Sequence, residues 1–249
     1  MSTSAKARKP IGIPLFRRSQ RRNLTDIPGR AEVLALSAVL LGYPDEQFDV
    51  LRSDLTTAIG DLPQSPAARL LQEFWVAFSA QTSMQAQRHY VETFDMRRKS
   101  SLFLTYYLHG DTRQRGMSLL MFKQRYRAYG FSPPENELPD YLPMVLEFAA
   151  VTGSGVGEGL LRLHRNGFEV IRTALHDRTS MYAMVLDAVA EILGPITERQ
   201  QEEISTLVAA GPPAETIGLE SPLAPYSTLS GGPDQPFGPP EFTCSPKGN

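Results

Sequence analysis

Apolar residues recur at steps of three and four along most of the chain, which places them on one face of a helix. Residues 46–60 show this spacing most simply, with apolar side chains at Phe48, Leu51, Leu55 and Ile59. Residues 66–79 carry a broader stripe of the same kind. No stretch has the pattern of a hairpin or of a strand–helix–strand unit, and no internal repeat is visible. The pattern predicts an all-α protein, a single non-repeating helical bundle of about ten helices.

Several of the predicted helices have recognisable ends. Asp45 and Ser65 stand where a side-chain oxygen can accept a hydrogen bond from a free amide of the first turn, and Pro66 suits that turn. Gly130 and Gly194 follow apolar runs, at places where helices commonly end. The short stretch SLFLTYYLHG, residues 101–110, has the length and aromatic content of a strand, but no partner strand is visible.

The two ends of the chain lack this periodicity. Residues 1–26 are a predicted disordered basic arm, and residues 211–249, with nine prolines and six glycines, are a predicted disordered tail. The helical domain then spans residues 27–210. Residues 1–30 carry a net charge of +7, residues 31–210 carry −6 and the remainder −3. Such an acidic body argues against nucleic-acid binding.

The chain carries few of the patterns that catalysis or metal binding needs. Cys244 is its one cysteine, so neither an intramolecular disulfide nor a cysteine-based metal site can form. None of the four histidines stands three or four residues from another, as a pair of metal ligands on one helix would. His89 and His164 are most simply surface or half-buried residues. Nucleophile, phosphate-loop and dinucleotide motifs are missing as well. We therefore predict a protein that is not an enzyme and has no catalytic, cofactor-binding or metal-binding residues.

The N-terminal region has some features of an export signal. Four arginines between residues 17 and 22 precede an apolar run at residues 31–41. However, Asp26, Pro28 and Glu32 interrupt the two regions, and no small-residue cleavage site follows. No apolar run approaches the roughly 20 residues of a membrane-spanning helix. We expect a cytoplasmic protein that does not insert into a membrane.

One stretch, ELPDYLPMVLEFAA at residues 137–150, has more acids and prolines than a plain core helix needs. Asp140 is placed to cap a helix that starts at Tyr141, with Pro143 in its first turn. Capping leaves the carboxylate of Glu137 spare, at a proline-stiffened corner suited to gripping a cationic or amide-rich peptide. An acid and base pair of Glu137 with Asp140 is the catalytic alternative, but no nucleophile or metal set accompanies it.

A second dense stretch, residues 92–116, has charges at both ends of an aromatic helix. Its notable side chains are Asp95, Arg97, Arg98, Lys99, Tyr106, Tyr107, His109 and Asp111. The stretch is either a buried helix between charged loops or a groove with aromatic walls and charged lips. The residues alone leave both interpretations open.

These stretches resemble a known family. LLGYPDE, YVETFDMRRKSSLFLTYYLHGDTRQRGMSLLMFKQRYRAYG and ELPDYLPMVLEFAA are similar to the nitrate reductase molybdenum cofactor assembly chaperones of the NarJ type, within the TorD-like family of helical maturation proteins. The resemblance runs from residue 36 to residue 193. It implies an all-α cytoplasmic chaperone that is not a catalyst. Its implied partner is the immature catalytic α subunit of a respiratory nitrate reductase, gripped at its extreme N-terminus.

The resemblance also implies how such a chaperone works. It holds the α subunit until the molybdenum cofactor is inserted, supports iron–sulfur loading and membrane docking, and does not join the final enzyme. We expect no stably bound cofactor in the chaperone itself, and cofactor-delivery proteins are further candidate partners. The wider family often has a histidine after its E-x-P-D acid, where this chain has Tyr141. The resemblance therefore carries over no role that needs an imidazole there, whereas contact and hydrogen bonding survive.

These arguments predict a groove that takes a short amphipathic helix of the client. Its predicted partner-binding residues are Tyr106, Tyr107 and Glu137 as lining, Asp140 and Tyr141 at the rim, and His109 and Asp111. Arg97 and Arg98 are candidate anion contacts. One alternative is an assembly chaperone for another molybdoenzyme that also binds the cofactor phosphates directly, through Arg97, Arg98, Arg113 and Arg115. Another is a structural helical adaptor with a different client.

Overall fold

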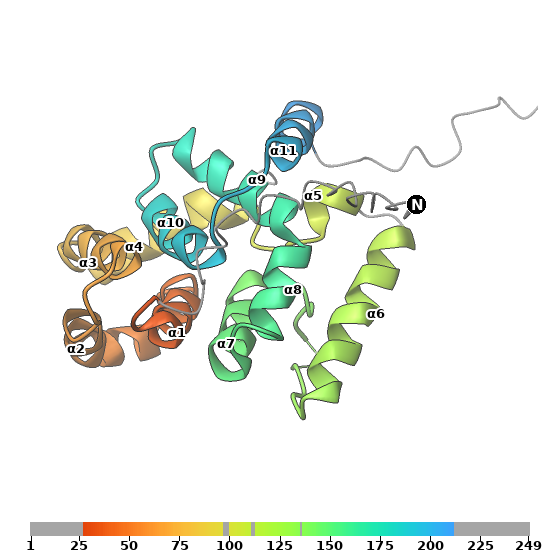
Figure 1. Ribbon diagram of the computed structural model, residues 1–249. Coiled ribbons are helices and arrows are strands. Elements are labelled where there is room, and N and C mark those ends of the chain that lie inside the picture. The colour runs from red at the N-terminus through yellow and green to blue at the C-terminus, as the bar shows by residue number, and fades with distance from the viewer. Residues whose placement is uncertain (1–26, 97–99, 111–112, 135, 212–249) are drawn as a thin grey trace, which may run out of the picture. The chain divides into compact units, whose positions relative to one another are not determined.

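The computed structural model describes residues 27–96, 100–110, 113–134 and 136–211, and its regular elements are all helical (Figure 1). They are α1 (Arg30–Leu40), α2 (Glu46–Gly60), α3 (Pro66–Ser79), α4 (Ser83–Tyr90), a π-helical turn (Val91–Asp95), α5 (Tyr106–His109), α6 (Arg113–Ala128), α7 (Leu142–Thr152), α8 (Gly157–Leu163), α9 (Arg165–His176), α10 (Tyr182–Leu193) and α11 (Glu198–Ala210). The predicted all-α fold is therefore confirmed. The predicted arm, and the predicted tail beyond its first residue, lie outside the described residues.

The predicted helix ends are confirmed where the structure describes them. The side chains of Asp45 and Ser65 accept hydrogen bonds from first-turn amides of α2 and α3, at 2.9 and 3.1 Å. Pro66 occupies the first turn of α3. Gly194 ends α10 with a φ of 80°, and Gly130 follows α6 with a φ of 77°. Both angles lie in the left-handed region that glycine adopts without a steric penalty.

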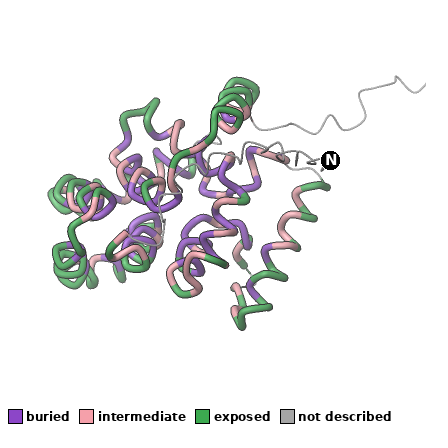
Figure 2. Tube along the Cα trace, viewed as in Figure 1, coloured by how far each residue is buried: buried purple, intermediate pink, exposed green. Residues whose placement is uncertain are grey.

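Helix α10 lies at the centre of the packing. It contacts α1, α3, α8 and α9, while α1 packs along α7 and α7 packs against α8 (Figure 1). Buried residues gather on the helix sides that face one another, whereas α11 is mostly exposed (Figure 2). Within the described ranges, none of the helices is long and apolar enough to cross a bilayer.

An aromatic cluster connects α10 to α3, α4 and the π-helical turn. Tyr182, at the start of α10, is its centre and is fully buried. Ring centroids 4.9 to 6.4 Å from that of Tyr182 belong to Phe74, Phe78, His89, Tyr90 and Phe94. Rings packed at these distances and mostly edge-on or tilted stabilise a core beyond the area that they bury. Burial also raises the pKa of the Tyr182 phenol.

Residues 101–110 form neither a regular strand nor a long helix. A single antiparallel bridge joins Phe103 to Tyr141, and the four-residue helix α5 follows directly. The strand-like composition of this stretch therefore corresponds to one local pairing. That pairing brings the stretch against the start of α7.

Candidate functional site

The two dense stretches of the sequence meet in the fold. The amide of Leu104 donates to the carbonyl of Asp140 at 3.1 Å, and the amide of Leu142 donates to the carbonyl of Leu102 at 2.8 Å. Phe103 and Tyr141 lie opposite each other in the bridge between these bonds. Two segments that are distant in sequence are thereby fixed side by side. Any site formed from both of them has a stiff backbone beneath it.

Asp140 maintains this pairing from inside the protein. Its Oδ2 atom accepts hydrogen bonds from the backbone amide of Thr105 at 3.0 Å and from the Thr105 hydroxyl at 2.6 Å, and its side chain is fully buried. Helix α7 begins at Leu142, after Tyr141, and no side chain caps it. The prediction that Asp140 caps this helix is therefore wrong. In this conformation Asp140 does not reach a surface rim, and its carboxyl group instead holds the loop of Thr105.

Tyr141 stands at the surface of the same corner and is half-buried. Its ring lies 5.5 Å from that of Phe103, and its hydroxyl lies 3.4 Å from the hydroxyl of Tyr90. Burial is the largest cause of a raised Tyr141 pKa, and the carboxylates of Glu137 and Asp95 raise it further. Two acids therefore act on one phenol, which stays protonated and able to donate.

Arg115 of α6 lies over two aromatic rings close to Tyr141. Its guanidinium carbon lies 5.4 Å from the ring centre of Tyr106 and 5.9 Å from that of Phe103. A cation over aromatic faces at such distances is attracted by the negative faces of the rings. All three residues are half-exposed. The arrangement leaves ring surface and a positive charge together at the protein–water boundary.

The remaining predicted partner-binding residues differ in position. Tyr107 is only 2% exposed and belongs to the core, where it lines a small pocket of about 60 Å³ with Val170 and Leu207 instead of joining the half-exposed rings. His109 is half-exposed at the end of α5. Asp111, Arg97 and Arg98 lie outside the described residues.

The structure thus brings together part of the predicted site. We call it the aromatic corner, defined by its half-exposed residues Phe103, Tyr106, Arg115, Glu137 and Tyr141. It offers aromatic faces, one cation and one carboxylate, which suits an amphipathic peptide better than a metal or a reacting small molecule. The predicted partner-binding site omitted Phe103 and Arg115, and Arg115 was named only as a phosphate contact of the alternative. The position of Phe103 in the aromatic run SLFLTYY was the available signal.

His164 is a second feature that differs from expectation. It was predicted to be at the surface or half-buried, but it is 5% exposed, between α8 and α9, with its ring 4.6 Å from that of Phe122. Neither ring nitrogen has a hydrogen-bond partner. Burial, together with the nearby His109, lowers the pKa of His164 to about 4. His89 is half-buried, as predicted.

A cleft that the sequence did not indicate lies along α9 and α10. It has a volume of about 1020 Å³, and its apolar lining comes from Ile27, Pro66, Ala67, Leu70, Ala190, Pro195 and Ile196. One wall is a chain of ion pairs from Arg165 to Glu169, Arg172 and Asp187, with N–O distances of 2.6 to 2.7 Å. The Nε2 atom of His176 lies 2.9 Å from the same carboxylate of Asp187. The spacing of 165, 169 and 172 on one helix was the available signal. A ligand there would meet both apolar surface and polar side chains, among them the exposed carboxylate of Glu191.

Within the described part of the chain, no three residues among His, Cys, Asp and Glu are grouped so as to hold a metal ion.

Comparison with known proteins gives a consistent set of relatives. The family model described as "Nitrate reductase delta subunit" matches residues 61–186, which include the whole aromatic corner. The chain is 31% identical to the probable nitrate reductase molybdenum cofactor assembly chaperone NarJ of Bacillus subtilis over 181 residues, covering 73% of this chain and 97% of that protein. It is 30% identical to the NarJ chaperone of Escherichia coli K12, over 64% of this chain and 68% of that protein.

A longer protein also matches. The nitrate reductase-like protein NarX of Mycobacterium tuberculosis H37Rv is 36% identical over 169 residues, which is 66% of this chain. The chain spans about a quarter of NarX, since the match covers 25% of that protein. The likeness to NarX therefore concerns one part of a larger protein.

Proposed function

The chain belongs to the nitrate reductase delta subunit family, and on that premise we propose that it is an assembly chaperone for a respiratory nitrate reductase. One observation carries the proposal. The similarity extends over nearly the whole of a relative that is named as a molybdenum cofactor assembly chaperone. The all-helical fold and the half-exposed rings of the aromatic corner are compatible with such a role.

The proposed client is the immature catalytic α subunit. The chaperone holds the N-terminal segment of that subunit while the molybdenum cofactor is inserted and the iron–sulfur centres are loaded, and it releases the client for membrane docking. It acts in the cytoplasm, catalyses no reaction and keeps no cofactor of its own. Cofactor-delivery proteins are the proposed transient partners. Release needs only a lower affinity for the mature client, which follows when the bound segment folds elsewhere.

The aromatic corner is the proposed docking surface for the client segment. Its rings are held in place before binding, because Tyr141 packs on Phe103 and Arg115 lies over Tyr106. Rigid aromatic side chains lose little entropy on binding, and they commonly provide most of the binding energy of an interface. Glu137 supplies a negative charge at the edge, which would set the register of a client segment with a positive charge.

Titration calorimetry with a peptide from the N-terminus of the α subunit tests the proposal. Saturable binding is expected for the native sequence and not for a scrambled peptide of equal charge. Glu137→Lys should weaken binding about tenfold, because an attraction becomes a repulsion. Circular dichroism of the variant should remain that of the wild type.

Glu191→Lys is the matched control. Glu191 is an exposed acid that lines the cleft along α9 and α10, away from the aromatic corner. Unchanged binding in Glu191→Lys, with weaker binding in Glu137→Lys, is the expected result. The reverse pattern would move the client to the cleft. If neither native nor scrambled peptide binds, the proposed recognition of the client N-terminus is wrong.

A further inference from the structure

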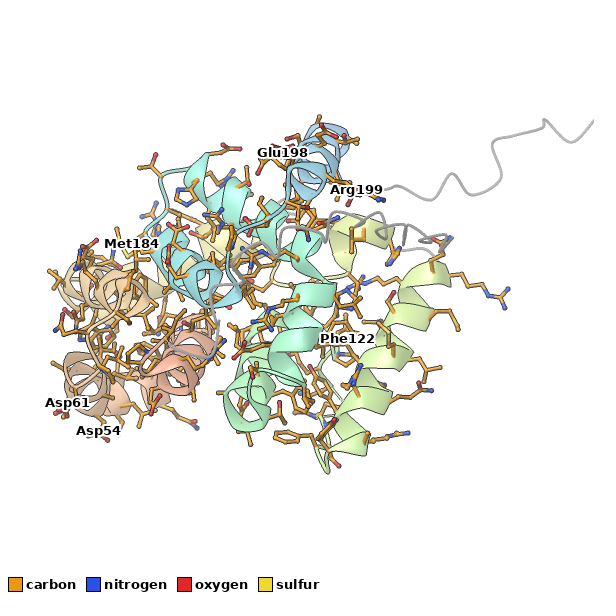
Figure 3. The ribbon with its side chains drawn as sticks, viewed as in Figure 1. Asp54, Asp61, Phe122, Met184, Glu198 and Arg199 are labelled. Carbon is orange, nitrogen blue, oxygen red and sulfur yellow. The ribbon has the colours of Figure 1, made fainter. Side chains whose placement is uncertain are left out.

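Helix α6 is attached to the rest of the protein along one narrow stripe. Of its 16 residues, Phe122 and Tyr126 are the buried ones. The ring of Phe122 points from α6 toward α8 (Figure 3) and lies against His164. The hydroxyl of Tyr126 donates to the carbonyl of Pro139 at 2.8 Å, and its ring lies 4.8 Å from that of Phe148. The side of α6 opposite this stripe faces outward.

The outward side has a regular pattern of its own. At 100° per residue, the positions opposite the buried stripe are Arg113, Met117, Leu120, Gln124 and Arg127. Their steps of four, three, four and three are the spacing of a coiled-coil seam. Met117 is 67% exposed and Leu120 is 46% exposed. Two neighbouring positions of the seam, Met117 and Leu120, are therefore exposed apolar residues, Gln124 is polar, and an arginine stands at each end.

The charge of α6 indicates what can pair with this seam. The helix carries five cations, Arg113, Arg115, Lys123, Arg125 and Arg127, and no acid. The whole segment 31–210 nevertheless has a net charge of −6. A second copy of α6 would be repelled, because like charges would face each other across the seam. A helix with glutamates or aspartates beside its apolar stripe would be attracted.

We propose that the outer face of α6 is a docking site for an acidic amphipathic helix of a partner protein. Apolar side chains of that helix pack on Met117 and Leu120, and its carboxylates pair with Arg113, Lys123 and Arg127. A lipid surface fits less well, because two exposed apolar side chains give a helix little to insert into a bilayer. This site is separate from client binding at the aromatic corner, which meets α6 through the inward-facing Arg115.

The test uses the full chain and a labelled designed peptide, followed by fluorescence anisotropy. The peptide has three heptads with leucine at the seam positions and glutamate beside them, and a scrambled peptide of the same composition is compared. We expect saturable binding of the patterned peptide, which weakens as ionic strength rises to about 0.15 M. Arg113→Glu with Arg127→Glu should reduce the affinity about tenfold, and Met117→Ser with Leu120→Ser should do the same.

The double variant Val50→Ser with Val76→Ser is the matched control. These valines are also strongly exposed, at 81% and 73%, but lie on α2 and α3. Their replacement should leave the affinity unchanged. Equal binding of the scrambled peptide, or full binding by the Met117 and Leu120 variant, would overturn the proposal. Binding to phosphatidylglycerol vesicles without binding to the peptide would also overturn it, in favour of a membrane.

The client peptide is titrated against the same variants. Retained client binding in the α6 variants, with loss of the acidic peptide, is expected if the two sites are independent. Loss of client binding in those variants would overturn the proposal of a separate site. Failure of the acidic peptide alone overturns the α6 proposal and leaves the client proposal standing.

Discussion

Helices α10 and α6 use their residues in opposite ways. Eight of the 12 residues of α10 are buried, against two of the 16 residues of α6. Helix α10 is surrounded by α1, α3, α8 and α9, whereas α6 carries five cations and contacts the body along one stripe. The contrast is visible in Figure 2, where α6 alternates between buried and exposed positions along its length.

The two helices therefore serve different purposes, since α10 stabilises the fold and α6 presents exposed side chains that are available for recognition. A helix that is buried on most sides stabilises the folded state through the apolar area that it removes from water, by about 25 cal/mol for each Å². A helix whose buried residues are two aromatic side chains contributes much less to the stability of the fold. Its other positions can therefore serve the binding of a partner. The aromatic corner lies between these extremes, since its backbone is pinned by Asp140 while its rings remain half-exposed.

Truncation of a core residue in α10 should have the largest effect on stability. Leu186 is fully buried, so Leu186→Ala leaves a cavity in addition to losing its own burial. We expect the free energy of unfolding to fall by about 2–5 kcal/mol. Urea denaturation followed by circular dichroism measures it.

The same truncation in α6 is the control. Leu120 is 46% exposed, so Leu120→Ala should change the free energy of unfolding by no more than about 0.5 kcal/mol. Similar losses in both variants would contradict the contrast between the two helices, because α6 would then contribute to stability as α10 does.

Acidification should reveal the buried histidine beneath α6. The pKa of His164 is about 4 in the folded protein, against about 6.5 in an unfolded chain. As the pH falls from 7 to 4, the unfolded state therefore takes up this proton first. The free energy of unfolding therefore keeps its full value above pH 6.5 as far as His164 is concerned. It falls as the pH drops from 6.5 toward 4, by up to about 3 kcal/mol. Denaturant titrations across this range measure the loss.

His164→Phe separates this effect from the titration of other groups. Phenylalanine keeps a ring against Phe122 and removes two buried nitrogens that have no partner. The variant should lose less stability on acidification than the wild type, and it should gain about 1 kcal/mol at pH 7. His109, the other histidine that affects His164, remains in both proteins. Equal pH dependence in the two proteins would show that His164 is not the group responsible.

The sequence predicts what depends on neighbours along the chain. Helix positions and the caps at Asp45 and Ser65 follow from spacings of three and four and from the residue that precedes each first turn. Asp140 has the same local signature, yet its carboxylate bonds to Thr105. Only the pairing of residues 102–104 with 140–142 decides between these two partners, and the sequence does not show that pairing.

Only part of the candidate site could be predicted, because it too depends on contacts between segments that are distant in the sequence. Tyr141 and Tyr106 were expected at a surface and are half-exposed, whereas Tyr107 is in the core. Helix α5 has only four residues, so its sequence does not show which of its two tyrosines faces the core. The burial of His164 likewise depends on Phe122, which lies on another helix. Neither the burial of Tyr107 nor that of His164 can be predicted from residue type and periodicity.

Replacing a glycine by alanine in a buried helix and in an exposed helix tests the contrast between them with the smallest change of side chain. In α9, a Cβ atom on Gly167 would come within 2.0 Å of the carbonyl oxygen of Leu104, in the loop that pairs with the start of α7. Gly167→Ala must therefore push two backbones apart, and we expect a loss of about 1–3 kcal/mol. In α6, a Cβ atom on Gly116 would meet nothing within 4 Å, so Gly116→Ala should gain about 0.5–1 kcal/mol through the helix preference of alanine. Urea denaturation of both variants gives the two signs directly, and a gain in Gly167→Ala would mean that α9 does not lie so close to Leu104.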